Sequence, residues 1–220
     1  MNEKIVAIDI ETENTGIDIM NDNTRIISVQ LHDGTKGEFY YANSTTSNLK
    51  VAKEKIKGLL NNGVQFVGYN ILRFDIPILK KFLDIEIPLS QVIDISEMKS
   101  IFFLKKELNK GGISLEEACK HFGIKCEHKK LLEPIAEKIR QYPEVIAKSE
   151  SEGLKLASKT GWGVERCRSN ALKKISGGMA ILEMYNEFVR SNGSIDSLFY
   201  KYAMGDAISE YELYYKLKTN

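Results

Sequence analysis

Cysteine is scarce in this sequence, which has only Cys119, Cys126 and Cys167 in 220 residues. An odd and small number of cysteines argues against a disulfide-bonded scaffold and favours a reducing compartment. Long apolar runs are also lacking. The first apolar stretch is interrupted by Asp9 and Glu11, unlike the core of a signal peptide, and no stretch approaches the length that crosses a bilayer. We therefore expect a cytoplasmic protein that does not enter the membrane.

An excess of either charge is lacking too, since 31 basic and 30 acidic residues leave a net charge of +1. This balance excludes a strongly basic coat protein. It does not exclude nucleic-acid binding, because an acidic metal site and a basic substrate track cancel in the total. Apolar residues make up 43% of the chain and charged residues 28%, as in an ordinary globular protein. We expect residues 1–220 to form a single domain.

The first hundred residues alternate between strand-like and helix-like patterns. The near-continuous apolar run at 4–10 is typical of a buried central strand. A glycine-containing turn at 33–37 predicts a hairpin between the two strands on either side of it. The predicted strands cover 4–10, 25–32, 37–42, 64–69 and 92–95, with helices at 48–61 and about 74–83. This order predicts an α/β fold with a mixed five-stranded sheet, three antiparallel strands followed by two parallel ones, flanked by helices.

From about residue 96 onward only helical patterns occur. Ser114 with Glu117 three residues later forms a capping-box pattern that opens a helix over Ile113–Phe122. Residues 130–159 are amphipathic and rich in charge, and long helices are expected over 164–191 and 196–217. Ser194 or Asp196 is the candidate N-cap of the last helix. The C-terminal half is therefore expected to be helical.

Two carboxylates stand two residues apart where the first predicted strand ends. Side chains alternate along a strand, so Asp9 and Glu11 are expected to point to the same face. Two carboxylates on one face of an apolar segment repel each other and are costly to bury unless a cation lies between them. The alternative is that the strand ends at Ile8 and both acids are solvated loop residues.

Two further acids stand at positions that could complete such a site. Asp75 follows the fourth predicted strand and opens a helix, although an acid at a helix start is also favoured by capping and by the helix dipole. Tyr202 and Asp206 are four residues apart in the last helix and share a face. The alternative for this pair is an exposed aspartate beside a packed tyrosine.

Taken together, the four acids suit phosphodiester cleavage with two divalent metal ions, Mg²⁺ or Mn²⁺. These ions prefer hard oxygen ligands and keep open positions for water and phosphate. Two of them about 4 Å apart hold the attacking and leaving oxygens of an in-line displacement. The predicted metal ligands are Asp9, Glu11, Asp75 and Asp206.

The chain resembles the DEDD superfamily of 3′–5′ exonucleases, in its tyrosine-containing (DEDDy) branch. The three motifs that carry the resemblance are Asp9-Ile10-Glu11-Thr12, Tyr69-Asn70-x-x-x-Phe74-Asp75 and Tyr202-x-x-x-Asp206. The second motif looks most like the exonuclease domain of family B DNA polymerases and their stand-alone relatives. The resemblance implies an RNase H-like fold. The helical stretch at about 130–193 departs from the family pattern and is expected to be an insertion.

The resemblance also implies roles for individual residues. Asp9 would bridge two metal ions, Glu11 and Asp206 would hold the ion that activates water, and Asp75 would support the second ion. Tyr202 would position the attacking water, and Thr12, Asn70 and Phe74 would contact the terminal nucleotide. The expected substrate is single-stranded DNA or RNA with a free 3′ end, DNA being favoured. We expect a monomer that acts with a replication or repair protein. An exoribonuclease and a non-catalytic nucleic-acid-binding module on the same fold remain alternatives.

A second group of potential ligands lies at Cys119, His121, Cys126 and His128. The spacing differs from that of standard zinc sites, and residues two apart on a helix do not face each other. A buried cysteine beside an exposed histidine is the favoured interpretation of the helical pair. The sequence leaves open whether these four residues bind a metal.

Overall fold

A computed structural model of the chain describes residues 4–13, 24–42 and 49–219. The chain divides into two compact units. The first unit comprises Met1–Glu11, Ile26–Glu127 and Ala203–Asn220, and the second comprises Thr12–Arg25 and His128–Tyr202. Within the described part of the chain, no helix combines the length and hydropathy of a membrane span.

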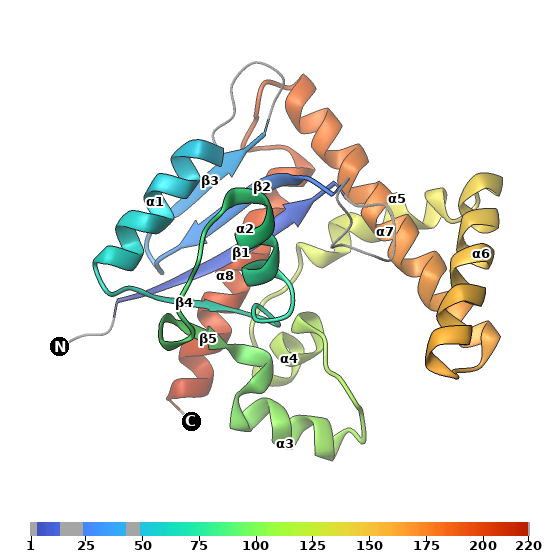
Figure 1. The fold of residues 1–220 in the computed structure, drawn as a ribbon, viewed down its shortest axis with the longest axis horizontal. Helices are drawn as coiled ribbons and strands as arrows, with labels where there is room; N and C mark the ends of the chain where they lie inside the picture. Colours follow the sequence, from blue (N-terminus) through green and yellow to red (C-terminus); the bar gives the residue numbers. More distant parts are fainter. Residues whose placement is uncertain (1–3, 14–23, 43–48, 220) are drawn as a thin grey trace. The chain divides into compact units, whose positions relative to one another are not determined.

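The first unit is built on a five-stranded sheet in the order β3-β2-β1-β4-β5 (Figure 1). Three antiparallel strands, β3, β2 and β1, are followed by β4 and β5, which pair in parallel. The α/β mixed sheet of an RNase H-like fold is thereby confirmed. The strands are β1 (Ile5–Thr12), β2 (Ile26–His32), β3 (Gly37–Tyr41), β4 (Gln65–Gly68) and β5 (Val92–Asp94).

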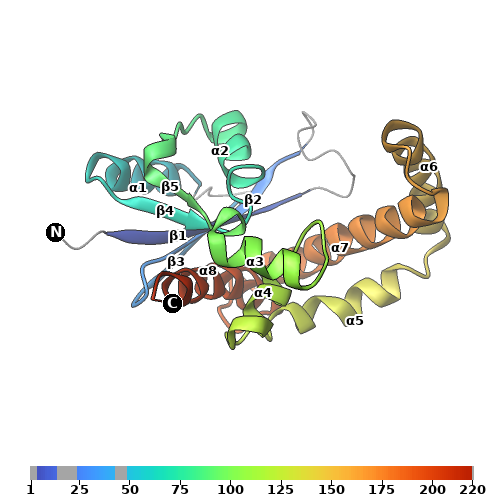
Figure 2. The same cartoon turned by 90° about the horizontal axis from the view of Figure 1, so that it is seen from below.

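Helices cover both faces of this sheet. Figure 2 shows α1 (Leu49–Asn61) and α2 (Asp75–Leu83) on one face, and the part of α8 (Leu198–Lys218) from Ala203 onward on the other. Two more helices, α3 (Lys99–Glu107) and α4 (Leu115–Phe122), follow β5, with short 3₁₀ turns η1 (Leu89–Gln91) and η2 (Ile95–Glu97) before them. Because β1, β4 and β5 run in parallel, their C-terminal ends lie at the same end of the sheet.

The core on the α8 face fixes the direction of the β1 side chains. Ile5 and Ala7 of β1 are buried in one apolar cluster with Leu213 of α8 and with Ile101 and Leu104 of α3. Because side chains alternate along a strand, the next two positions on this face of β1 are Asp9 and Glu11. The hydrophobic pattern thus places two acids at the end of an otherwise buried row.

The second unit is helical over most of its length. It contains α5 (Lys129–Ile139), α6 (Pro143–Thr160) and α7 (Val164–Arg190), together with the first turn of α8. Ala136, Ile139, Val145, Ile175 and Ala180 form its core. The helical C-terminal half is confirmed.

Three details differ from the sequence-based expectations. The amphipathic stretch at 130–159 is two helices, broken where Tyr142 takes an extended conformation before Pro143, as proline requires of the residue before it. The N-cap candidates Ser194 and Asp196 were wrong, because the Ser197 hydroxyl accepts the hydrogen bond from Tyr200 N at the start of α8. Helix α3 was not expected as a separate element.

Candidate active site

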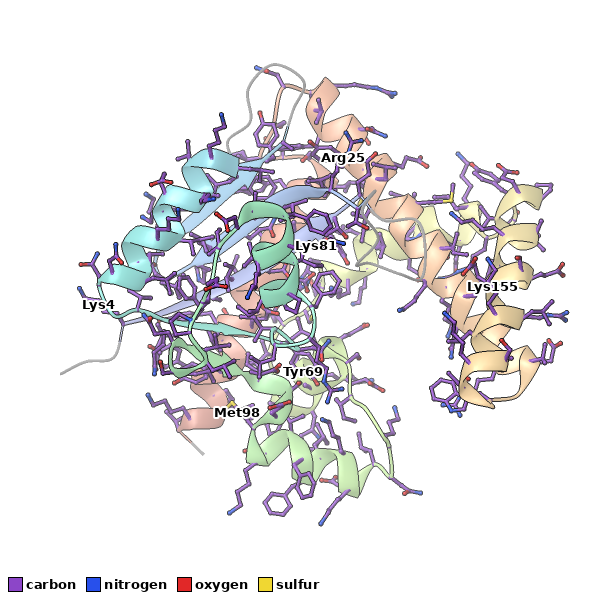
Figure 3. The ribbon with its side chains drawn as sticks, viewed as in Figure 1. Lys4, Arg25, Tyr69, Lys81, Met98 and Lys155 are labelled. Atoms are coloured by element: carbon purple, nitrogen blue, oxygen red, sulfur yellow. The ribbon has the colours of Figure 1, made fainter. Side chains whose placement is uncertain are left out.

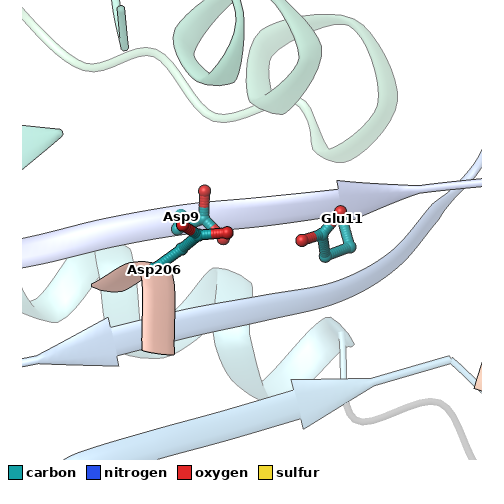
Figure 4. Close-up of side chains that lie close together, drawn as sticks. All are labelled: Asp9, Glu11 and Asp206. Atoms are coloured by element: carbon teal, nitrogen blue, oxygen red, sulfur yellow. The ribbon is translucent and has the colours of Figure 1, made fainter. Parts of the chain in front are cut away.

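Three carboxylates of the first unit come together at the end of β1. Asp9 and Glu11 project from the same face of the strand, and Asp206 reaches them from α8 (Figure 4). One oxygen from each lies within 4.8 Å of the others. Among residues 4–13, 24–42 and 49–219, this is the only group of three or more Asp, Glu, His or Cys side chains placed this closely. The strand continues past Ile8 to Thr12, so the interpretation of both acids as solvated loop residues was wrong.

Two of the three carboxylates are buried, and Asp9 is partly buried. Glu11 is 9% exposed and Asp206 is 4% exposed. Burial raises the pKa of Asp9 well above its usual range, and the nearby charges of Asp206, Glu210, Glu11 and Asp75 raise it further. Negative charge is therefore concentrated where water is scarce, which is the electrostatic situation that a bound cation relieves.

Asp75 lies against the backbone of the strand that carries the first two acids. It is the first residue of α2 and is 3% exposed. Its Oδ1 accepts a hydrogen bond from Ile10 N at 3.2 Å. Burial raises the pKa of Asp75 to about 8; hydrogen bonds from its own N–H and from Ile10 oppose that rise, whereas Asp94 and Asp206 add to it. The fourth acid is therefore adjacent to Asp9 and Glu11.

The loop before Asp75 is held by a buried aspartate that sequence analysis did not assign. Asp94, at the end of β5, accepts hydrogen bonds from Asn70 N at 2.9 Å, Leu72 N at 3.2 Å and Ser96 N at 2.9 Å. Asn70 has a positive φ of 63° and an exposed side chain, and Phe74 is half-buried. Asp94 therefore fixes the backbone of the loop that carries Asn70 and Phe74 and leads into Asp75.

Glu210 is a fifth carboxylate near the site, and sequence analysis missed it. It follows Asp206 by one helical turn in α8 and is 3% exposed. Its Oε1 accepts a hydrogen bond from Tyr69 N at 2.8 Å, and the Tyr69 hydroxyl donates to Ile113 O at 2.6 Å. The spacing of four from Asp206 was the available signal, since it continues the same helix face. Glu210 joins α8 to the end of β4.

Gln30 is a third residue that sequence analysis missed. It lies on β2 and is fully buried. With its amide nitrogen directed toward Asp9, it donates to the Asp9 carbonyl oxygen at 2.7 Å and to Asp9 Oδ2 at 3.2 Å, while its oxygen accepts from the Ser28 hydroxyl at 2.6 Å. The only sign of it in the sequence was a glutamine within a mostly apolar strand pattern. Gln30 fixes both the backbone and the carboxylate of Asp9.

Thr12 and Tyr202 belong to the second unit. Thr12 is the last residue of β1 and is 8% exposed. Tyr202, four residues before Asp206 in α8, is 5% exposed. Lys129 Nζ donates to the Tyr202 hydroxyl at 3.3 Å and lies 4.8 Å from the ring centroid, and the His128 ring meets the tyrosine edge-on. The phenol therefore has a cation beside its oxygen.

The cysteine–histidine segment has a different arrangement. Cys119 is buried, and its hydrogen bond with Cys126 raises its pKa, as does burial. The exposed His121 ring packs edge-on against Phe122, with 4.8 Å between ring centroids. This pair matches the interpretation of a buried cysteine beside an exposed histidine.

The mixed sheet and the carboxylates at the end of its central strand define an RNase H-like domain of the exonuclease type. A protein-family model described as 3′–5′ exonuclease matches residues 1–130. The chain belongs to this 3′–5′ exonuclease family. A comparison with curated proteins found no matching relative.

Proposed function

We propose that this protein removes nucleotides from the 3′ end of single-stranded nucleic acid, DNA in preference to RNA, by hydrolysis of phosphodiester bonds. The observation that carries the proposal is the convergence of Asp9, Glu11 and Asp206 within 4.8 Å in a member of the 3′–5′ exonuclease family. The cluster supplies the negative oxygen ligands that such chemistry needs.

The donor set fits divalent metal ions of the hard class. All three side chains of the cluster are carboxylates, which suit Mg²⁺ or Mn²⁺ better than metals that prefer nitrogen or sulfur. The raised pKa of Asp9 indicates charge that lacks compensation from the protein alone. When bound, two such ions lower the pKa of water and balance the negative charge of the phosphate.

We assign to the residues the roles that the resemblance implies. Asp9 would bridge both ions, Glu11 and Asp206 would hold one of them, and Asp75 the other. Tyr202 would orient the attacking water, as in the tyrosine-containing branch that the motifs resemble. Thr12, Asn70 and Phe74 would contact the terminal nucleotide, the Phe74 ring by stacking on its base.

Two observations support a proposal for the domain organisation. The family match ends at residue 130, whereas Asp206 belongs to the cluster. We therefore propose that residues at about 130–193 are a helical insertion in a single exonuclease domain. We also propose that the protein is a monomer and that it acts beside a replication or repair protein. Light scattering on the purified chain tests whether it is a monomer.

A time course on 5′-labelled single-stranded DNA and RNA of equal sequence tests the proposed function. The reactions contain Mg²⁺, Mn²⁺ or a chelator, beside the Asp9→Ala variant. We expect a metal-dependent ladder that shortens from the 3′ end, is faster on DNA and is absent for Asp9→Ala. A preference for RNA would make the protein an exoribonuclease. Full activity of the variant would overturn the assignment, and binding of both strands without cleavage would favour a non-catalytic module.

A further inference from the structure

Helix α3 of the first unit exposes two adjacent aromatic rings. Phe102 is 50% exposed and Phe103 is 54% exposed, and their ring centroids lie 6.0 Å apart. The opposite side of the same helix is buried, since Ile101 is 0% and Leu104 is 2% exposed within the apolar core. The helix is therefore anchored by its inner face, and the two phenyl rings contribute to surface rather than to the core.

Each of these rings has a lysine beside it. Lys106 Nζ lies 4.6 Å from the Phe102 ring centroid, and Lys99 Nζ lies 5.7 Å from that of Phe103. Both pairs are four residues apart, so each lysine extends over a ring on its own helix face. The segment 99–111 contains four lysines against one acid, Glu107. The aromatic surface thus has a positive border.

A hollow of about 470 Å³ opens beside the rings. Its lining has lysine and asparagine side chains around one phenyl ring and a glycine: Phe102, Lys105, Lys106, Asn109, Lys110 and Gly111. Lys110 also pairs with Glu117 of α4. No acidic residue lines the hollow, so it suits a negatively charged group.

Contacts within the first unit connect this helix to the active-site loop. Lys105 Nζ donates to Ser96 O at 2.9 Å, and Ser96 N donates to Asp94 Oδ1, which also accepts from Asn70 N. Figure 3 labels Met98, the residue before α3, and Tyr69, which precedes the active-site loop. The α3 surface therefore has a fixed position relative to the loop that ends in Asp75.

Exposed aromatic rings bordered by cations are the combination by which proteins hold single strands without reading their sequence. Bases stack on the rings and phosphates pair with the cations. An apolar partner would use the rings but would supply no anion for Lys99 and Lys106, which lie over them. We propose that the outer surface of α3, with Phe102, Phe103, Lys99 and Lys106, together with Lys110 of the segment after the helix, binds the single-stranded part of the substrate upstream of its 3′ terminus. This inference rests on the proposed function, because it takes the substrate to be a single strand.

Fluorescence anisotropy with a labelled 20-nucleotide strand of thymidylate, in the presence of chelator, measures binding without cleavage. We expect the Phe102→Ala/Phe103→Ala variant to bind at least about tenfold more weakly than the wild type, since loss of one stacked base weakens binding about fivefold or more. The matched control is Leu89→Ala, which removes another exposed side chain of this unit (74% exposed) and should bind as the wild type does.

A second pair of variants tests the lysines independently. The salt dependence is the slope of the logarithm of the binding constant against the logarithm of the salt concentration. Lys106→Ala/Lys110→Ala should reduce the magnitude of this slope by about 1 to 2, because each lost phosphate contact reduces it by about 1. Lys57→Ala, an exposed lysine on α1, should leave the slope unchanged. Inorganic polyphosphate should compete for the lysines, but its binding should be insensitive to the phenylalanine substitutions because it has no bases.

These results separate the α3 proposal from the proposed function. Strand binding that depends on Phe102 and Phe103, in a protein that cleaves nothing when metal is added, would support the α3 surface and overturn the exonuclease activity. Equal affinity of the wild type and the double phenylalanine variant would overturn the α3 surface whether or not the protein cleaves. The α3 surface would also be overturned if the wild type bound no single strand.

Discussion

The Gln30 amide donates hydrogen bonds to Asp9 at two points, the backbone carbonyl at 2.7 Å and the carboxylate Oδ2 at 3.2 Å. The same side chain accepts from the Ser28 hydroxyl, so its orientation is fixed from the opposite side. Residues that orient a metal ligand from behind tune both its geometry and its basicity. Gln30 is therefore a positioning residue for the Asp9 carboxylate.

Replacing Gln30 by methionine keeps the buried volume and removes both donors. We expect Gln30→Met to weaken metal affinity or to slow cleavage about tenfold or more, as the loss of a residue behind a metal ligand typically does. The metal concentration at half-maximal activity and kcat measure the two effects. Ser28→Ala, which keeps the Gln30 amide, should have a smaller effect. Wild-type metal dependence of Gln30→Met would contradict the assigned role.

Metal binding should stabilise the folded protein. Glu11 and Asp206 are buried and Asp9 is partly buried, so the cation offsets a repulsion among like charges that exists only in the folded state. At a metal concentration of about 100 Kd, the gain is about 2.7 kcal/mol in the free energy of unfolding. Thermal melts with Mn²⁺, Mg²⁺ or chelator should therefore differ by several degrees for the wild type.

Asp9→Asn serves as the variant for this measurement. In chelator, Asp9→Asn should melt at a higher temperature than the wild type, because one of the clustered charges is gone. Added metal should raise its melting temperature less than that of the wild type. A metal-induced rise as large as that of the wild type would place the ion elsewhere.

The stability of the metal-free protein should decrease as pH rises. The pKa of Asp75 is raised to about 8 in the folded state, above about 3.9 for an unfolded aspartate. The folded state thus binds a proton more tightly than the unfolded one. The stability that this proton provides is complete below about pH 4 and is lost as pH rises through 8. Melts in chelator from pH 5 to pH 9 measure it, and Asp75→Asn should flatten the dependence; an unchanged profile would contradict the attribution to Asp75.

The sequence was most informative where periodicity and local chemistry agree. The apolar run before Asp9 and the turn between β2 and β3 predicted the sheet, and alternation along β1 correctly placed Asp9 and Glu11 on one face. The prediction that Asp206 joins them was also correct, because the helix that carries it packs on that face of the sheet.

Residues that act through backbone atoms of distant segments could not be found in this way. Gln30, Asp94 and Glu210 each form a hydrogen bond with a partner more than 20 positions away, and their local sequence pattern does not identify that partner. Helix α3 was missed for a related reason. Its phenylalanines at 102 and 103 are exposed, so the apolar residues do not follow the spacing of a buried helical face.

Asp94 should matter for both stability and activity. Its carboxylate accepts three backbone N–H groups, from Asn70, Leu72 and Ser96. Asp94→Ala would leave buried donors without a partner, at a cost of about 1–3 kcal/mol in the free energy of unfolding. Asp94→Asn keeps one acceptor oxygen, the one to which Asn70 and Ser96 both donate in the wild type. It should therefore lose less stability than Asp94→Ala. Denaturant titration measures stability, and KM for a short strand reports the position of the loop. Equal stability of the two variants would contradict this account.

Tyr202 should affect the rate of cleavage rather than metal binding. It stands one helical turn before Asp206 on the same face, and its oxygen accepts a hydrogen bond from Lys129, because an ammonium group can only donate. The hydroxyl proton is therefore directed away from Lys129. Tyr202→Phe removes this proton and keeps the ring, so we expect a loss of about 100-fold in kcat, the size of effect that a misplaced reactant produces. The metal concentration at half-saturation should stay unchanged.

Tyr200→Phe, two residues earlier on a different face, is the matched control and should cleave at the wild-type rate. A wild-type kcat for Tyr202→Phe would exclude the phenol from orienting water, and the carboxylates alone would then have to position the nucleophile.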